Sequence, residues 1–240
     1  MNKLLIFRLI FTLIFWTITF FPGLFVPRIL QYNTLWPIFS KLFLNAAKIR
    51  VKYVGKIDLK KIENVIIVAN HRSFADTFVV TSLLRKPFTI TFIMWMTKFP
   101  LFKLLMNKMS LIPIPKNNLL KQKESIEKTI KILEKNYSVI YFPEGRFVHD
   151  EPIGQLKKGI VKIAKESGCA IMPISIYGTG IKKDFLFDKK LVWKDVYVNS
   201  AEPVKYTDYN DDNILLKELT STMRNLYIDL ERNFSPNMQV

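Results

Sequence analysis

Short apolar runs alternate with amphipathic segments along most of the chain. Runs rich in β-branched residues predict strands at 65–69, 89–94, 111–114, 138–142, 170–177 and 191–198. Apolar residues at helical spacing predict helices at 78–84, 98–109, 119–135, 156–167 and 214–233. Strands that alternate with helices indicate an α/β fold, with a mixed, largely parallel sheet flanked by helices.

The first 48 residues are predicted to form a separate membrane-associated helical segment. No charged residue occurs between 9 and 27, and apolar side chains cover every face of this run, which suits lipid. The unbroken part, 9–21, would be about 20 Å long at ~1.5 Å per residue, whereas the hydrocarbon core is about 30 Å thick. We therefore expect a two-helix element that enters one leaflet, turns at Pro22 and Gly23, and returns through 29–44. A single spanning helix is the alternative.

The charge of the chain is consistent with a membrane surface. Lys and Arg number 36 and Asp and Glu 20, a net charge of +16, which favours polyanions or anionic lipid. No nucleic-acid-binding motif accompanies this charge, so no nucleic-acid partner is expected. The basic residues in and after the second apolar segment suit a cytoplasmic membrane face; they are Lys41, Lys48, Arg50, Lys52 and Lys56. The remaining part, 49–240, is expected to form the α/β domain on the cytosolic face of the inner (cytoplasmic) membrane.

Few residues are available for metal or disulfide chemistry. Cys169 is the only cysteine, so an internal disulfide is impossible, and a reducing cytosolic environment fits. The two histidines, His71 and His149, are far apart in the sequence, which argues against a dedicated zinc site. We expect neither a metal nor a cofactor.

A histidine and a carboxylate follow the strand predicted at 65–69. A neutral imidazole such as His71 can take a proton from a hydroxyl near pH 7. A carboxylate bonded to its other nitrogen, such as Asp76, would fix the tautomer and stabilise the imidazolium. Ser73 and Asp76 also match a helix-capping box with Asp in place of Glu or Gln, so the spacing alone leaves a capping role open.

A second polar loop follows the strand predicted at 138–142. Arg146 has the planar guanidinium that suits phosphate, and Gly145 allows a backbone to approach a ligand closely. Together with Glu144 they could equally form a turn with solvated charges. Because both loops follow strands, we expect them at the carboxyl ends of the sheet, where sites in α/β folds form.

The two loops resemble sequence blocks of the glycerolipid acyltransferase family, the group that contains 1-acylglycerol-3-phosphate acyltransferases. Segment 70–76, NHRSFAD, matches the N-H-x4-D block, and segment 142–146, FPEGR, resembles F-P-E-G-T-R. Further segments with similarity to family blocks occur in the expected order at 98–100, 111–116, 156–159 and 171–174. The resemblance covers roughly residues 50 to 200.

The resemblance implies an acyltransferase domain over 49–240, with His71 as the general base and Asp76 as its orienting partner. The acceptor hydroxyl would attack the thioester of acyl-CoA or acyl carrier protein, without a covalent acyl-enzyme. The residues that would hold the acceptor, the basic ones near its phosphate, are Lys98, Lys116, Glu144, Gly145 and Arg146. The implied acceptor is a lysophospholipid, 1-acylglycerol-3-phosphate, which gives phosphatidate. The alternatives are another lysolipid, an amino-acid lipid, or a non-catalytic protein that binds anionic lipid.

Two positions depart from the family pattern. Lys116 stands where Arg is usual, which would replace a bidentate grip on phosphate by a point charge. The block at 142–146 is one residue short. Either its Thr is deleted and Arg146 is the family Arg, or Arg146 occupies the Thr position and Phe147 replaces the Arg. Phe147 can offer only packing.

Overall fold

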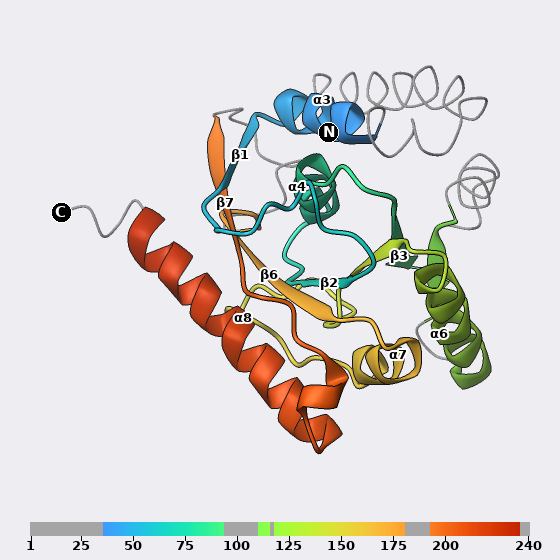
Figure 1. Cartoon of the computed structure of the whole chain (residues 1–240). Coiled ribbons are helices and arrows are strands. Elements are labelled where there is room, and N and C mark those ends of the chain that lie inside the picture. The colour runs from blue at the N-terminus through green and yellow to red at the C-terminus, as the bar shows by residue number, and fades with distance from the viewer. Residues whose placement is uncertain (1–35, 94–109, 116–117, 181–192, 236–240) are drawn as a thin grey trace, which may run out of the picture.

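One mixed sheet carries the helices and loops of the chain (Figure 1). The computed structural model describes residues 36–93, 110–115, 118–180 and 193–235. Its strand order is β1-β7-β6-β2-β5-β3-β4. The strands are β1 (Ile49–Tyr53), β2 (Ile66–Ala69), β3 (Phe88–Ile93), β4 (Ile112–Ile114), β5 (Ser138–Tyr141), β6 (Ile171–Tyr177) and β7 (Lys194–Ser200). Within these residues every pairing of named strands is parallel except β6 with β7, so the predicted mixed, largely parallel sheet is confirmed.

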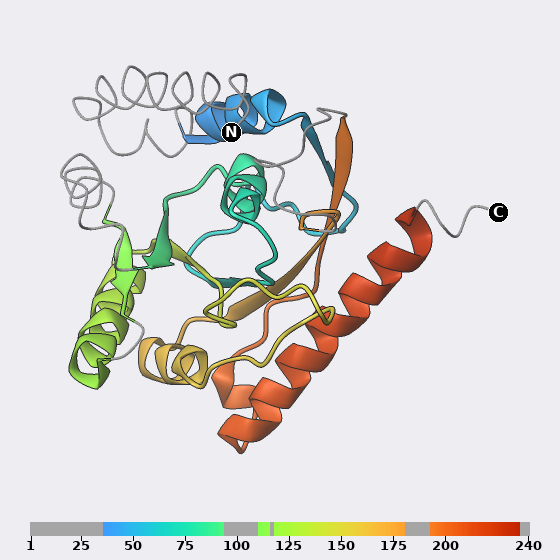
Figure 2. The same cartoon turned by 180° about the vertical axis from the view of Figure 1, so that it is seen from behind.

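Helices cover both faces of the sheet (Figures 1 and 2). The helices on one face are α3 (Trp36–Ala46) and α4 (Ala75–Leu83). Those on the other face are α6 (Leu119–Leu133), α7 (Gly159–Ser167) and α8 (Asp212–Phe234), and a 3-10 turn, η4 (Tyr206–Asp208), precedes α8. The helix α7 ends at Gly168, which is left-handed with φ 68°, as expected for a glycine C-cap.

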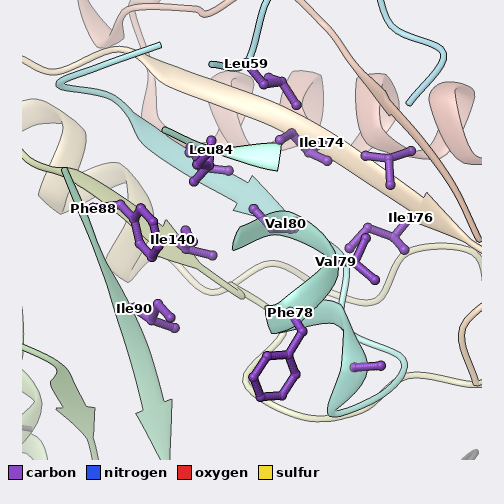
Figure 3. Packing of buried hydrophobic residues seen from close by; sticks show 14 of the residues in the cluster. Leu59, Phe78, Val79, Val80, Leu84, Phe88, Ile90, Ile140, Ile174 and Ile176 are labelled. Atoms are coloured by element: carbon purple, nitrogen blue, oxygen red, sulfur yellow. The ribbon is translucent and has the colours of Figure 1, made fainter. Parts of the chain in front are cut away.

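The central strand β2 is buried on both faces, and its side chains alternate between two apolar layers. Ile67 and Ala69 pack with α3 and α4, and Ile66 and Val68 pack with α7 and α8. All four are 0% exposed, as expected for a parallel strand between helical layers. Figure 3 shows apolar side chains of α4 against those of β5 and β6. This packing fixes the start of α4, and therefore Asp76, relative to the end of β2.

The helix α3 occupies the second half of the apolar segment predicted at 29–44. Its inner face belongs to the domain, because Phe43 is buried and stacks on Phe78 of α4 with ring centroids 3.9 Å apart. Its outer face mixes apolar and polar residues: Ile38 and Leu42 are 49% and 43% exposed, and Lys41 and Asn45 are exposed beside them. Among the described helices, none is both long and apolar enough to cross a membrane. The first helix of the predicted two-helix element lies in 1–35, outside the described residues.

Several element boundaries differ from the sequence-based prediction. The edge strand β1, which pairs with β7, was not predicted, because its apolar residues alternate with basic ones that read as surface. The helix α7 begins at Gly159, later than the predicted start at 156. The residues before it belong to the preceding loop, where the amide of Lys157 donates to the carbonyl of Pro143 (3.0 Å). The helix predicted at 98–109 lies outside the described residues.

Candidate active site

The two loops predicted to carry the chemistry meet beyond the carboxyl ends of β2 and β5. These strands are parallel neighbours, so both loops leave the same edge of the sheet. The amide of His71 donates to Oε2 of Glu144 over 3.0 Å, which joins the loops directly. Asn70 fixes the start of the first loop to β6: its side chain donates to the carbonyl of Ile176 (3.0 Å) and accepts from the amide of the same residue (2.7 Å).

His71 and Asp76 form a hydrogen-bonded pair. Nδ1 of His71 lies 3.1 Å from Oδ2 of Asp76, and the side-chain exposures are 17% and 0%. The same oxygen accepts from the amides of Arg72 and Ser73, each over 2.7 Å. A carboxylate that takes these donors accepts from Nδ1–H as well, which leaves Nε2 of the imidazole with a free lone pair. This is the arrangement that a histidine needs to act as a general base.

The capping role that the spacing left open is also present in part. The helix α4 starts at Ala75, and the amide of Ala75 donates to Oγ of Ser73 over 3.2 Å. The amide of Ser73 in turn donates to Oδ2 of Asp76, which is the reciprocal half of a capping box. One carboxylate therefore serves both the turn into the helix and the imidazole of His71.

Glu144 lies where its carboxylate binds the backbone of the protein itself. It is 4% exposed, Oε2 accepts from the amide of His71, and Oε1 accepts from the amide of Gly154, each over 3.0 Å. Burial raises the pKa of Glu144, and the two backbone N–H groups act in the opposite direction. The family resemblance implied that Glu144 helps to hold the acceptor, and this stays a prediction; these contacts join its own loop to the loop of His71.

The turn at Gly145 brings a lysine close to the second loop. Gly145 has φ 64°, and a Cβ at this position would lie 2.9 Å from Cε of Lys157. The close approach that a glycine permits here is therefore that of the Lys157 side chain. Arg146 is exposed at the same turn. The other two predicted phosphate ligands, Lys98 and Lys116, lie outside the described residues.

Two aromatic rings contact the imidazole of His71. Phe142 stacks on it with centroids 4.1 Å apart and an interplanar angle of 22°. Phe147 meets it edge-on, with centroids 4.5 Å apart and an angle of 63°. Phe142 was predicted only as a member of the block at 142–146, and Phe147 only as a packing residue.

Arg72 is a further residue of the site that sequence reasoning passed over. It is 7% exposed, and its guanidinium donates to the carbonyls of His149 (2.9 Å) and Glu151 (2.7 Å). It also lies over the ring of Tyr227 in α8, with its Cζ 5.3 Å from the centroid. The one available signal was its position next to His71, but its partners are 77 and 79 residues away in the chain.

The α/β domain holds a histidine bonded to a buried carboxylate at the end of a strand. The cations Arg146 and Lys157 lie at the neighbouring turn. The fold and site therefore define an α/β protein with a histidine–carboxylate pair. Residues 50–177, more than half of the chain, match the family model described as Acyltransferase. The chain therefore belongs to the acyltransferase family.

Individual relatives and a solved structure agree with this membership. The chain is similar to "1-acyl-sn-glycerol-3-phosphate acyltransferase LPAT1, chloroplastic" of Arabidopsis thaliana, with 30% identity over 56% of this chain and 39% of the relative. It is similar to the 1-acyl-sn-glycerol-3-phosphate acyltransferase of Borreliella burgdorferi, with 26% identity over 72% of this chain and 70% of the relative. The matched part is thus well under half of the plant protein. The fold is shared with the crystal structure of the 1-acyl-sn-glycerophosphate (LPA) acyltransferase PlsC from Thermotoga maritima, with TM-score 0.75, 22% identity and 98% of both chains covered.

Proposed function

We propose that the protein transfers a fatty acyl group to the free hydroxyl of a lysophospholipid. The donor is a thioester, acyl-CoA or acyl carrier protein. Nε2 of His71 removes the proton of the acceptor hydroxyl while its oxygen bonds to the acyl carbon. The carbon–sulfur bond then breaks, the thiol leaves with a proton, and an ester remains on the lipid. Asp76 stabilises the imidazolium that forms in between.

The proposed acceptor is 1-acylglycerol-3-phosphate, and the product phosphatidate. Both relatives compared above carry a name that contains this acceptor. Arg146 and Lys157 place two cations beside Gly145, on the same edge of the sheet as His71. An arginine can bind a phosphate with two parallel N–H groups, and a lysine adds a point charge. Lys98 and Lys116 are proposed as further cations near the phosphate.

The hydrogen-bonded pair of His71 and Asp76 is the observation that carries this proposal. His71→Ala should lower acyl transfer by about 10²- to 10⁴-fold, the usual contribution of a general base. His149→Gln is the matched control, because it alters the other histidine, whose side chain is exposed and whose carbonyl, not its ring, contacts Arg72. Purified wild type and both variants should be incubated with lysolipids and both donors, and the products read by mass spectrometry. Near wild-type activity in His71→Ala would remove the basis of the mechanism.

We further propose that residues 1 to 48 enter the cytoplasmic membrane from the cytosolic side without crossing it. The apolar run at 9–21 and its break at Pro22 support this placement. Single cysteines at Asn2 and Lys48, introduced with Cys169→Ser, should both be labelled from the cytosolic side only. Labelling of position 2 from the opposite side would indicate a spanning helix instead.

A further inference from the structure

Phe147 is the outer of the two rings against His71. Phe142 is 9% exposed, whereas Phe147 is 38% exposed. The side chain of His71, which contacts both rings, is 17% exposed. A histidine ring rotates easily about χ2, since that torsion has no sharp staggered wells. The hydrogen bond of 3.1 Å from Nδ1 to Asp76 and the stacked ring of Phe142 both restrain this rotation. The contact with Phe147, at 63° to the imidazole plane, adds a further restraint.

The backbone that carries Phe147 is fastened to the loop of His71. The amide of Val148 donates to the carbonyl of His71 over 2.8 Å, and Val148 is 1% exposed. The guanidinium of Arg72 holds the carbonyls of His149 and Glu151. These hydrogen bonds hold the backbone that follows Phe147, and they therefore fix the position of Phe147 beside the imidazole, although its ring is partly exposed to solvent.

We propose that Phe147 is a positioning residue for the general base, and that it favours the lipid hydroxyl over water as the attacking group. Phe147 restrains the His71 ring so that Nδ1 stays on Asp76, and its contact reduces the exposure of the imidazole to water. This inference rests on the proposed function, because it assigns how that same base is kept selective. Water activated by an exposed His71 would attack the same thioester and release a free fatty acid and a thiol.

The contact itself can be tested without any activity. The full chain in detergent micelles, with isotope-labelled histidine, gives ring signals from only two histidines, and His149→Gln assigns them. Two adjacent phenyl rings should displace the His71 ring resonances by their ring currents. Phe147→Leu, which removes the aromatic ring but keeps an apolar side chain, should move these resonances. Phe234→Leu is the matched control, because Phe234 is also partly exposed but stacks on Tyr197 instead of His71.

The kinetic consequence is measured in the same variants. Phe147→Leu should lower kcat for acyl transfer by about 2- to 10-fold, the range that corresponds to one lost aromatic contact. The acceptor KM should stay the same, because a positioning residue acts on the base and not on the binding of the acceptor. The ratio of thioester hydrolysis to transfer should rise. Phe147→Trp should restore both kcat and this ratio, whereas Phe234→Leu should leave the ratio unchanged.

Each result separates this inference from the proposed function. Unmoved His71 resonances in Phe147→Leu would overturn the ring contact. A higher acceptor KM with unchanged kcat would overturn the positioning role and make Phe147 an acceptor contact. An unchanged hydrolysis ratio beside a reduced kcat would overturn the selectivity. A wild-type chain that transfers no acyl group, yet shows the Phe147-dependent resonance shift, would refute the function and retain the contact.

Discussion

Asp76→Asn removes a buried charge while the hydrogen bonds around it can remain. Oδ2 of Asp76 accepts from the amides of Arg72 and Ser73 and from Nδ1 of His71. Oδ1 is buried and has no hydrogen-bond partner within the described residues. An asparagine fits with its carbonyl oxygen at the Oδ2 position, held there by the two backbone N–H groups. The amide NH2 then takes the Oδ1 position, and His71 keeps its proton on Nδ1.

The loss in rate should therefore reflect the missing charge and not a wrong tautomer. Two unit charges about 4 Å apart interact by about 4 kcal/mol at an effective dielectric constant of about 20. A tenfold change in rate corresponds to about 1.4 kcal/mol, so kcat should fall by about 10²- to 10³-fold. A wrong tautomer in a comparable triad costs about 10⁴-fold. Placing the NH2 group in a buried site without an acceptor should also lower the free energy of unfolding by roughly 1 to 3 kcal/mol.

The measurement compares Asp76→Asn with Asp76→Ala in steady-state acyl transfer and in chemical unfolding. The alanine leaves the amides of Arg72 and Ser73 without an acceptor, at roughly 1 to 3 kcal/mol for each buried group, so it should be the less stable variant. A kcat for Asp76→Asn within about tenfold of wild type would mean that the charge contributes little, against the general-base role. A loss of about 10⁴-fold, the cost of a wrong tautomer, would mean that the two amides fail to orient the asparagine.

Three other variants test the second loop. Glu144→Gln should lower the free energy of unfolding by about 1 to 3 kcal/mol, because the NH2 group of the glutamine must face one of the two backbone N–H donors. Urea titration measures this loss. Wild-type stability of the variant would contradict the bracing role of Glu144. Gly145→Ala should cost about 1 to 2 kcal/mol for a left-handed residue and should raise the acceptor KM, because the added Cβ displaces Lys157. The control Gly168→Ala should cost the same amount, because Gly168 is also left-handed, but it should leave the KM unchanged, because its Cβ would meet open space. Arg146→Ala should raise the acceptor KM by about 10- to 100-fold and leave the donor KM unchanged. Arg146→Lys should recover only part of the lost acceptor affinity. An unchanged acceptor KM in Arg146→Ala would mean that lysines alone bind the phosphate.

The sheet and the position of the site could be predicted because both depend on local patterns. β2 and β5 are short apolar runs that end in polar loops, and parallel neighbours place such loops at one edge. The helix that starts at Ala75 then brings Asp76 back to His71. The strand β1 was missed because it lies at the edge, where Arg50 and Lys52 face solvent and remove the apolar run that marks a buried strand.

The roles of individual site residues depend on contacts that no local pattern contains. The partner of Oε1 in Glu144 is an amide ten residues on, and that of Oε2 is 73 residues back. The sequence of a polar loop therefore cannot show that an acidic residue accepts hydrogen bonds from the backbone of the protein itself. The contact of Phe147 could not be predicted either. From the sequence, an apolar residue at an exposed turn is expected only to pack, but the ring of Phe147 contacts the imidazole of His71.

The contacts of both carboxylates separate positioning from binding within the site. Three consecutive amides, those of His71, Arg72 and Ser73, donate to Glu144 or Asp76, both of which are nearly inaccessible. A run of N–H groups of this kind is a common anion site in proteins, but here the protein's own carboxylates occupy it. A phosphate placed there would meet negative charge. We therefore expect the phosphate of the proposed acceptor to bind outside this segment, on the exposed side of the turn at Gly145, where Arg146 and Lys157 lie.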